Sequence, residues 1–516
     1  MTAQTRPDTP SPLRLAFWFG RVDGRPASVF RMAFALLLFW DALYHLPLAT
    51  FFYSDIGVVP RAALLELARG DRFSLLDAMP YAWMSSLVFV VWALVAVGLL
   101  VGYRTRLMAV LNFLLILSIH ERNVYVLTGA DSITRALSFW MIFIPLGAYY
   151  SLDARRALQA GLPWDRTGYA FPVRMMWLQV ALVYLFAGWL KALGPMWTGG
   201  TAMAYIVQLN TLLYPVGVWL RDNAPAAVLT FMTYAAMVGE LLFALLVFAP
   251  FGQPLLRVLG LLFGVGLHVG IGLMLSIPAF SIVMITSYLI FVPPTWLAAA
   301  DHAIRRRPGR SSEPDPITTP EPHAPLAVLK PPRLVLTIAL SLLMIGVIWW
   351  NVDYLGEYSD PIAPMPSGVR TVMYYSGLWQ YWDLFSPMPL QIDGWITIPA
   401  EFEDGTRLDL RTGQPPTTDP QHIAFGPWVR WEKFEENVFN NAYQAILQAW
   451  GGHYCHEYNI LQARPEGERL ARFQIIFRYK RSVAPGAEPT PYVDELLWTH
   501  WCYDQYQAYS PKRRLM

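Results

Sequence analysis

The sequence predicts an all-α polytopic membrane domain with about eight or nine transmembrane helices, followed by a small α+β extracytoplasmic domain. Hydrophobic residues make up 55% of the 516 residues and charged residues only 15%, whereas soluble domains carry about 25% charged residues. The charged residues are scarce mainly between residues 28 and 350, and residues 351–516 have an ordinary soluble composition. The chain is therefore neither a purely cytosolic enzyme nor a disordered protein.

The N-terminal segment, residues 1–27, contains four arginines and no apolar run, so we expect no cleavable signal peptide there. Nine apolar stretches follow, and a membrane span needs about 20 mostly apolar residues. The third stretch is short and is compatible with a re-entrant segment. The nine stretches are residues 28–47, 82–102, 106–120, 133–150, 172–191, 227–249, 255–275, 280–299 and 332–350.

Positively charged residues in the loops predict the orientation, because cytoplasmic loops are enriched in Lys and Arg. The loops on the N-terminal side carry 15 Lys and Arg residues and the loops on the other side carry 7. This predicts a cytoplasmic N-terminus in the cell membrane. With nine spans, the chain after Trp350 is periplasmic or in an equivalent compartment; an even number of spans would place it inside.

The spans and loops define the predicted domains. Residues 28–300 form the membrane domain, and residues 301–331 form a proline-rich cytoplasmic linker. An additional helix, residues 332–350, leads to the C-terminal domain, residues 351–516. The net charge of +2 does not indicate nucleic-acid binding, and membrane lipid is the expected surrounding.

The C-terminal domain shows strand and helix patterns. Residues 395–402 and 406–410 flank Asp404-Gly405, which predicts a β-hairpin. Residues 471–478 predict another strand, and residues 434–450 predict a helix between them. An aromatic run is predicted to form an interfacial belt or the domain core, with a ligand shelf as the alternative; it comprises Trp379, Tyr381, Trp382, Phe385 and Trp395.

The two cysteines of the chain, Cys455 and Cys502, both lie in this domain. An oxidising compartment outside the membrane favours a disulfide between them. Metal binding together with His453 and His456 is the alternative, but ligands so close in sequence rarely all face one ion. We therefore predict a disulfide and no metal.

Polar residues gather between the third and fourth apolar stretches. His120, Arg122, Asn123, Asp131 and Arg135 supply donors, acceptors and charges of both signs within a short segment. One interpretation is a solvated loop in which Asp131 caps the following helix. The other is the polar mouth of a cavity that faces outward.

Lys191 ends a long apolar helix at the predicted outer boundary of the membrane. By its position alone, the side chain is expected to reach water while its stem covers lipid. If the side chain instead turns inward, desolvation favours the uncharged amine, which is a base. Trp197 and Gly199-Gly200 follow, a turn that can bring the backbone close to a ligand.

Four other polar residues lie within predicted spans. Arg31 and Asp41 are expected to pair with neighbouring helices, and Glu240 is expected to be a structural hydrogen-bond partner rather than a proton carrier. His268 lies in a glycine-rich stretch that allows close helix packing. An interhelical hydrogen bond is its expected role, and contact with a ligand is the alternative.

Several of these segments together resemble the horizontally transferred transmembrane (HTTM) domain, the membrane part of vitamin K-dependent gamma-glutamyl carboxylase and of many bacterial proteins. The resemblance covers about residues 15–300, and Asp131 resembles the bacterial branch. The segments that carry it are residues 31–41 and 52–61, His120 to Asn123 with Asp131 and Arg135, and residues 139–140, 145–147 and 151–153.

The resemblance implies a function for these residues. Lys191 matches the lysine implicated as the base that deprotonates a quinone-like cofactor, vitamin K hydroquinone or menaquinol, and Asp131 belongs to the same catalytic site. In the family, the cofactor then reacts with oxygen, a proton is removed from a substrate glutamate, and carbon dioxide adds. The residues implied to line the cofactor site are His120, Arg122, Asn123, Arg135, Trp197 and His268.

The preferred prediction is thus a gamma-carboxylase-like membrane enzyme of carboxylase or epoxidase type, whose C-terminal domain covers the site and presents a protein or peptide substrate. The alternative is a non-catalytic scaffold or receptor in which Lys191 faces the lipid surface. Transport is a third possibility, but the sequence shows no repeated halves. It also lacks phosphate-loop and zinc-protease motifs.

Overall fold

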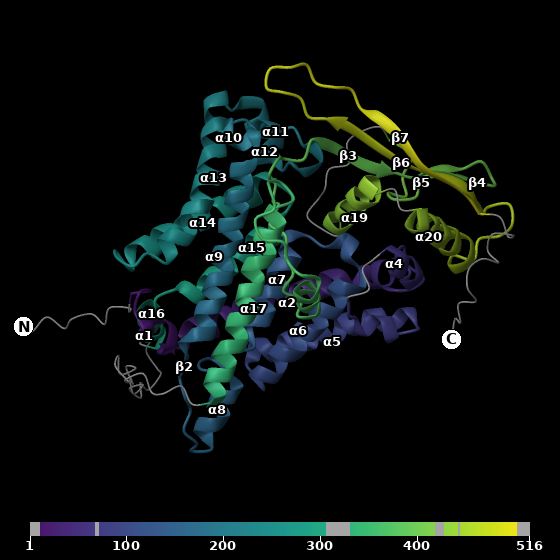
Figure 1. Cartoon of the computed structure of the whole chain (residues 1–516). Helices are drawn as coiled ribbons and strands as arrows, with labels where there is room; N and C mark the ends of the chain where they lie inside the picture. The colour runs from purple at the N-terminus through teal and green to yellow at the C-terminus, as the bar shows by residue number, and fades with distance from the viewer. Residues whose placement is uncertain (1–10, 68–71, 306–330, 418–427, 442–443, 503–516) are drawn as a thin grey trace, which may run out of the picture.

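The computed structural model describes residues 11–67, 72–305, 331–417, 428–441 and 444–502. In these residues, a bundle of helices carries a small sheet with two helices at one end (Figure 1). The predicted linker, residues 301–331, lies mostly outside the described residues. The all-α membrane domain followed by a small α+β region is confirmed.

Six helices in the described residues are long and apolar enough to cross a membrane. Each of them coincides with a predicted apolar stretch, which confirms a multi-pass membrane protein; which side faces the cytoplasm stays a prediction. The six are the segment Arg25–Tyr53, made of α2 (Arg25–His45), η1 (Leu46–Leu48) and α3 (Ala49–Tyr53), and α5 (Ala82–Val101), α9 (Ala170–Leu193), α13 (Ala226–Val247), α14 (Leu255–Met274) and α17 (Pro331–Leu355).

The other three predicted stretches are less regular. Residues 106–120 form α6 (Thr105–Arg122), whose C-terminal end is charged, and the stretch 133–150 begins in α7 (Gly129–Met141), which has only 13 residues. The stretch 280–299 is bent by 92° between α15 (Pro278–Ser287) with η5 (Tyr288–Phe291) and α16 (Pro294–Arg305). Pro293 and Pro294 lie at the bend and interrupt the helix because proline lacks an N–H. Counting this bent pair as one span gives up to seven.

Short elements complete the bundle. Strands β1 (Arg21–Asp23) and β2 (Thr167–Tyr169) pair antiparallel and join the N-terminal segment to the start of α9. The other short elements are α1 (Leu15–Phe19), α4 (Arg61–Leu67), η2 (Leu75–Ala78), η3 (Val124–Val126), α8 (Leu152–Gln159), α10 (Pro195–Thr198), α11 (Ala202–Ile206), η4 (Asn210–Leu212), α12 (Pro215–Asn223) and α18 (Ser367–Tyr375).

Arg31 holds α2 against the end of α5. The side chain is fully buried, and its guanidinium group donates hydrogen bonds to the carbonyl oxygens of Leu99, Leu100, Leu146 and Tyr150. The last carbonyls of a helix have no partner within the helix, so Arg31 satisfies two of them. The predicted pairing of Arg31 with a neighbouring helix is confirmed.

The C-terminal sheet is antiparallel and is built around its longest strand, β6 (Leu470–Arg481). Strands β3 (Ile392–Thr397) and β4 (Pro399–Phe402) pair with one edge of β6, and β7 (Val493–Trp501) pairs with the other. Strand β5 (Arg407–Asp409) extends the sheet beyond β4, and Gly405 in the turn between them has φ of +85°. The predicted hairpin and the predicted β6 strand are confirmed.

Two helices lie beneath this sheet, facing the membrane bundle (Figure 1). The predicted helix over residues 434–450 is helical in the part that the structure describes, as α19 (Trp428–Asn441) and α20 (Gln444–His456), and residues 442–443 lie outside the described residues. A short π-helical turn, η6 (Glu457–Leu461), follows. The predicted disulfide is confirmed: Cys455 on α20 is bonded to Cys502 after β7, with the two Cα atoms 5.4 Å apart.

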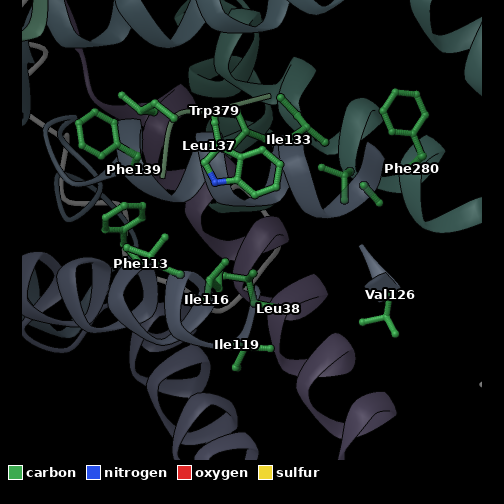
Figure 2. Close-up of a cluster of buried hydrophobic side chains, with 14 of the residues drawn as sticks. Leu38, Phe113, Ile116, Ile119, Val126, Ile133, Leu137, Phe139, Phe280 and Trp379 are labelled. Atoms are coloured by element: carbon green, nitrogen blue, oxygen red, sulfur yellow. The ribbon is translucent and has the colours of Figure 1, made fainter. Parts of the chain in front are cut away.

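The segment after α18 inserts into the membrane bundle. Trp379, Trp382 and Trp395 of the aromatic run are buried, as the core interpretation predicted. However, Trp379 does not lie in the core of the sheet domain: Figure 2 shows it beside Ile133 and Leu137 of α7. The C-terminal region is therefore anchored within the helices, not only placed on their ends.

Candidate functional site

Lys191 lies in the last turn of α9, and its side chain is buried in the bundle. Its exposed fraction is 3%, and Nζ donates to Glu240 Oε2 at 2.9 Å. The ammonium group also lies over the Trp197 ring, 5.1 Å from its centroid. A lysine that reached the membrane surface would leave its ammonium group in water. That interpretation, which position alone favoured, is wrong.

Glu240 on α13 is the carboxylate that pairs with Lys191, and it too is buried. The sequence predicts a partner for Glu240, and the structure identifies it. Helices α9 and α13 come close at Gly188, where a Cβ would lie 3.0 Å from the Leu241 backbone nitrogen and 3.1 Å from Glu240 Cβ. The absence of a side chain at Gly188 therefore allows the two charged groups to meet.

Three further polar side chains join this pair. Tyr184 precedes Lys191 by two helical turns on the same face of α9, and its hydroxyl forms a hydrogen bond of 2.6 Å with His268 Nε2. The same hydroxyl bonds to the Tyr288 hydroxyl. We call Lys191, Glu240, Tyr184, His268 and Tyr288 the lysine cluster. The predicted interhelical hydrogen bond of His268 is confirmed.

Buried polar atoms without partners lie on α14 and α15, within or near the lysine cluster, and on the segment that joins these helices. Within the described residues, His268 Nδ1, Ser276 Oγ and Ser281 Oγ are buried and have no hydrogen-bond partner. The Phe280 ring lies 5.3 Å from the His268 ring, and a Cβ on Gly272 would lie 3.7 Å from Ser281 Oγ. Buried polar groups nearly always have partners, so this set has unused capacity for a bound water or a ligand.

A second polar cluster lies where the C-terminal region meets the helices. Arg430 on α19 makes two hydrogen bonds to Asp131, with Nη1 2.5 Å from Oδ2 and Nη2 2.6 Å from Oδ1. Arg430 also donates to His45 Nε2 at 2.5 Å and to the Val126 carbonyl at 2.7 Å. His120 Nε2 lies 3.5 Å from Asp131 Oδ1. We call Arg430, Asp131, His45 and His120 the arginine cluster.

The arrangement of donors fixes the histidine tautomers in the arginine cluster. Arginine only donates, so His45 Nε2 and His120 Nδ1, which face Arg430 and Arg135, accept. The proton of His45 is then on Nδ1, which donates to the Asp41 carbonyl oxygen at 2.8 Å and lies 3.1 Å from Asp41 Oδ1. In the described residues Asp41 thus pairs along its own helix, and the prediction that it pairs with a neighbouring helix is wrong.

The arginine cluster holds both of its charged residues in their ionised forms. Burial by itself raises the pKa of Asp131, at the first turn of α7, but the charge and hydrogen bonds of Arg430 hold the pKa of that carboxyl well below its usual range. Burial opposes the charge of Arg430, but Asp131 outweighs this and raises the pKa of Arg430. Thr128 contributes its backbone N–H and hydroxyl to Asp131, so Asp131 also caps α7 as one interpretation predicted.

The remaining predicted pocket residues make contacts with the protein itself. Arg135 donates to the carbonyls of Gly377 and Trp379 and lies over the Trp379 ring. Arg122 bonds to Asp55 and the Val59 carbonyl, and Asn123 to the Phe52 carbonyl. Trp197 donates to the Phe385 carbonyl. These residues fix the loops and the inserted segment around the two clusters.

The two clusters are adjacent but separate. Phe280, whose ring meets His268, also lies near Gly129 at the start of α7, where a Cβ would be 3.6 Å from the ring and 2.8 Å from Leu384. The sequence grouped Lys191 and Asp131 in one site, whereas the structure pairs Lys191 with Glu240 and Asp131 with Arg430. Apolar side chains thus lie between the two charge pairs.

A hollow of about 690 Å³ is found elsewhere, beside α8. Its lining includes Val101, Tyr149, Tyr150, Arg155 and Arg166, and none of the predicted site residues. It is therefore distinct from both clusters.

Sequence reasoning missed four members of the clusters: Tyr184, Tyr288, Arg430 and His45, which lies one helical turn after Asp41. The spacing of seven residues between Tyr184 and Lys191 would have placed both on one helix face. Tyr288 lies within the predicted apolar stretch that follows His268, where no sequence pattern singled it out. No pattern indicated Arg430, because its partner Asp131 is 299 residues away in the chain.

Comparison with known proteins supports the resemblance to the HTTM domain, which grouped Lys191 and Asp131 in one site. The family model of the HTTM domain matches residues 19–296. No solved structure matches the chain. Because the family match covers more than half of the sequence and includes α2 to α15 with both Lys191 and Asp131, the protein belongs to the HTTM domain family.

Proposed function

We propose that the lysine cluster binds a lipophilic quinol, such as vitamin K hydroquinone or menaquinol, and that Lys191 is the base that deprotonates it. The observation that carries this proposal is the burial of Lys191 against Glu240 among helices, beside polar atoms that have no partner. Membership of the HTTM domain family, which includes the vitamin K-dependent carboxylase, supports the same assignment.

The lysine–glutamate pair offers a route to an uncharged amine. A buried ion pair is costly, and transfer of one proton from Lys191 Nζ to Glu240 Oε2 across the 2.9 Å contact leaves two neutral groups. The amine of Lys191 can then take a proton from a phenolic hydroxyl. The resulting ammonium group pairs with the phenolate that remains, so the charge stays balanced within the apolar bundle.

The residues present fit such a ligand. His268 Nδ1 and Ser281 Oγ are buried polar atoms without partners in the described residues, and they suit hydroxyl or carbonyl oxygens. The Phe280 ring lies against His268 and the Trp197 ring lies against the Lys191 ammonium group, and such rings suit contact with a flat aromatic headgroup. When bound, the quinol supplies the reducing power for reaction with oxygen, the chemistry of carboxylase and epoxidase type. Arg430 holds the C-terminal domain in place beside the lysine cluster. We propose that this domain presents a protein or peptide substrate there.

The test uses the purified protein with a two-ring naphthoquinol. Two measurements are made: binding, by quenching of tryptophan fluorescence, and aerobic oxidation above the spontaneous rate. General base catalysis contributes about 10²–10⁴-fold, so Lys191→Met is expected to lose oxidation by about that factor while binding changes only a few-fold. Arg221→Met is the control, since Arg221 is paired with Asp222 at the surface.

Wild-type rates in Lys191→Met would refute the base role. If the wild-type protein neither binds nor oxidises the naphthoquinol, the quinol proposal is wrong and the non-catalytic scaffold or receptor becomes the better account. The orientation, with a cytoplasmic N-terminus and a periplasmic C-terminal domain, is likewise proposed from the loop charges; accessibility labelling of Cys455→Ser protein at Cys502 from either side tests it.

A further inference from the structure

Two buried arginines lie at the opposite end of α9 from the lysine cluster. Arg174 and Arg257 are each 4% exposed. Arg174 lies in the second turn of α9 and Arg257 is the third residue of α14. Since Arg174 and Lys191 are separated by 17 residues of one helix, they lie about 25 Å apart along its axis.

Both arginines contact the same aromatic side chain. The guanidinium carbons of Arg174 and Arg257 lie 4.0 and 4.6 Å from the centroid of the Trp177 ring. The two like charges are therefore no farther apart than the sum of these distances. The Phe17 ring of α1 also contacts Arg174, with its centroid 4.0 Å from the guanidinium carbon.

Neither arginine has a negatively charged partner in the described residues. The hydrogen bonds that the structure shows for them run from Arg174 Nε to the Phe17 carbonyl, at 3.2 Å, and from Arg257 Nε to the Val247 carbonyl, at 3.5 Å. These bonds use only the two Nε groups. The buried arginines elsewhere are better satisfied: Arg31 bonds to four carbonyls, and Arg430 has a carboxylate.

We propose that Arg174 and Arg257 form a binding site for a phosphate group, supplied by an anionic phospholipid at the membrane surface. Burying a guanidinium charge is costly unless it is paired, and two like charges on one indole ring repel each other. Contact with an aromatic face offsets only part of this cost. An anion between the arginines would balance both charges, and guanidinium groups bind phosphate oxygens through paired hydrogen bonds.

The position favours a lipid as the source of the phosphate. Arg174 and Arg257 lie within about 6 Å of the ends of α9 and α14, where these spans reach the membrane surface. Phe251, in the turn between α13 and α14, and Leu255, the first residue of α14, are 72% and 64% exposed, as expected for side chains in contact with lipid. Basic pockets between transmembrane helices are known to bind anionic headgroups.

The test measures lipid binding to the purified, lipid-stripped full chain by native mass spectrometry and by thermal unfolding. The probes are phosphatidylglycerol, diacylglycerol with the same acyl chains but no phosphate, and inorganic phosphate. Phosphatidylglycerol is expected to bind and raise the unfolding temperature, and diacylglycerol is not. Arg257→Gln is expected to weaken phosphatidylglycerol binding about 10- to 100-fold. Arg155→Gln, at an exposed arginine of α8, is the control and should bind as the wild type does.

A second readout separates binding from structural support. Because two unpaired like charges destabilise the lipid-free protein, Arg257→Gln should raise the unfolding temperature of the stripped protein while losing the gain that phosphatidylglycerol gives. Binding of inorganic phosphate without phosphatidylglycerol would support the phosphate site with a soluble ligand instead of a lipid. The proposal is overturned if neither probe binds, or if Arg257→Gln and Arg174→Gln both bind phosphatidylglycerol as tightly as Arg155→Gln.

Discussion

The lysine cluster and the arginine cluster each bury a pair of opposite charges, but they differ in how much of their hydrogen-bonding capacity is already used. The Lys191 ammonium has three N–H groups, and Glu240 is its one hydrogen-bond partner among the described residues. Asp131 receives two hydrogen bonds from Arg430 and two from Thr128, and His120 lies beside it. The first pair retains free donors, and the second has almost none.

This difference indicates two functions for residues that the sequence placed in one site. A fully paired polar network makes a contact rigid and specific, which suits a joint between the C-terminal region and the membrane helices. A buried network with unpaired polar groups lowers the stability of the folded protein. Such a network is expected where a bound ligand supplies the missing hydrogen bonds. Asp131, predicted as a catalytic residue, already accepts four hydrogen bonds from Arg430 and Thr128, whereas Lys191 and His268 have unused groups.

The largest expected effect is on the arginine cluster. Arg430→Met leaves the Asp131 carboxylate buried without a charged partner, which costs about 3–5 kcal/mol of the free energy of unfolding. Thermal unfolding of the purified protein measures this loss. Limited proteolysis should show release of the C-terminal region before the helices unfold.

Two further variants sharpen this result. Arg472→Met removes an exposed arginine that pairs with Glu401 on the sheet surface, and it should cost less than about 1 kcal/mol. Arg430→Met combined with Asp131→Leu removes both charges and should recover much of the lost stability. If Arg430→Met is as mild as Arg472→Met, the arginine cluster does not hold the two regions together.

The difference between the clusters also explains what the sequence could predict. The membrane spans follow from long apolar runs, the hairpin from Asp404-Gly405, and the disulfide from two cysteines in one domain. These features depend on local composition. Hydropathy alone predicted the third, fourth and eighth apolar stretches less well, because charges or prolines interrupt them, as at Pro293-Pro294 in the eighth.

The side-chain partners depend on three-dimensional contacts and were not predictable in the same way. A lysine at the end of an apolar helix can place its ammonium group at the membrane surface or inside the helix bundle. The close approach of α13 at Gly188, which brings Glu240 to Lys191, favours the inside of the bundle. The resemblance to the HTTM domain located Lys191 but not its carboxylate. Arg430 lies on an ordinary amphipathic helix, and nothing in its neighbours indicates Asp131.

A smaller effect is expected where the lysine cluster depends on helix contact. Gly188→Ala places a Cβ about 3 Å from the backbone of Leu241 and from Glu240 Cβ, so α9 and α13 must move apart. Overpacking of this kind costs about 1–3 kcal/mol. Thermal unfolding measures the loss, and naphthoquinol binding should weaken because Glu240 is displaced from Lys191.

The matched control for this variant is Gly266→Ala on α14. A Cβ at Gly266 meets no atom within 4 Å, so this substitution should leave stability unchanged or raise it by up to about 1 kcal/mol through better helix propensity. Equal effects of the two substitutions would show that the α9–α13 contact does not depend on the small residue.

The smallest expected effect is a difference in acid stability between the C-terminal sheet and the arginine cluster. Burial lowers the pKa of His500 on β7 to about 4, and its Nδ1 accepts a hydrogen bond from Trp498 Nε1 at 3.2 Å. The pKa of histidine in the unfolded chain is about 6.5. Between this pH and about 4, His500 is therefore protonated in the unfolded chain but neutral in the folded domain. Stability of the sheet domain therefore falls as the pH drops from about 6.5 to 4, by about 1–2 kcal/mol after allowance for solvent screening.

The arginine cluster should not respond over the same range. The pKa of Asp131 is lowered, so its contribution is complete above the unfolded value of about 3.9 and is lost only as the pH falls further, through the folded pKa. Unfolding followed by hydrogen exchange between pH 7 and 4 should thus show the sheet around Phe473 loosening while α7 stays protected. His500→Gln should flatten the response of the sheet. An equal loss of protection in α7 would show that acid also breaks the contact between Asp131 and Arg430. The prediction that this pair resists acid over this pH range would then be wrong.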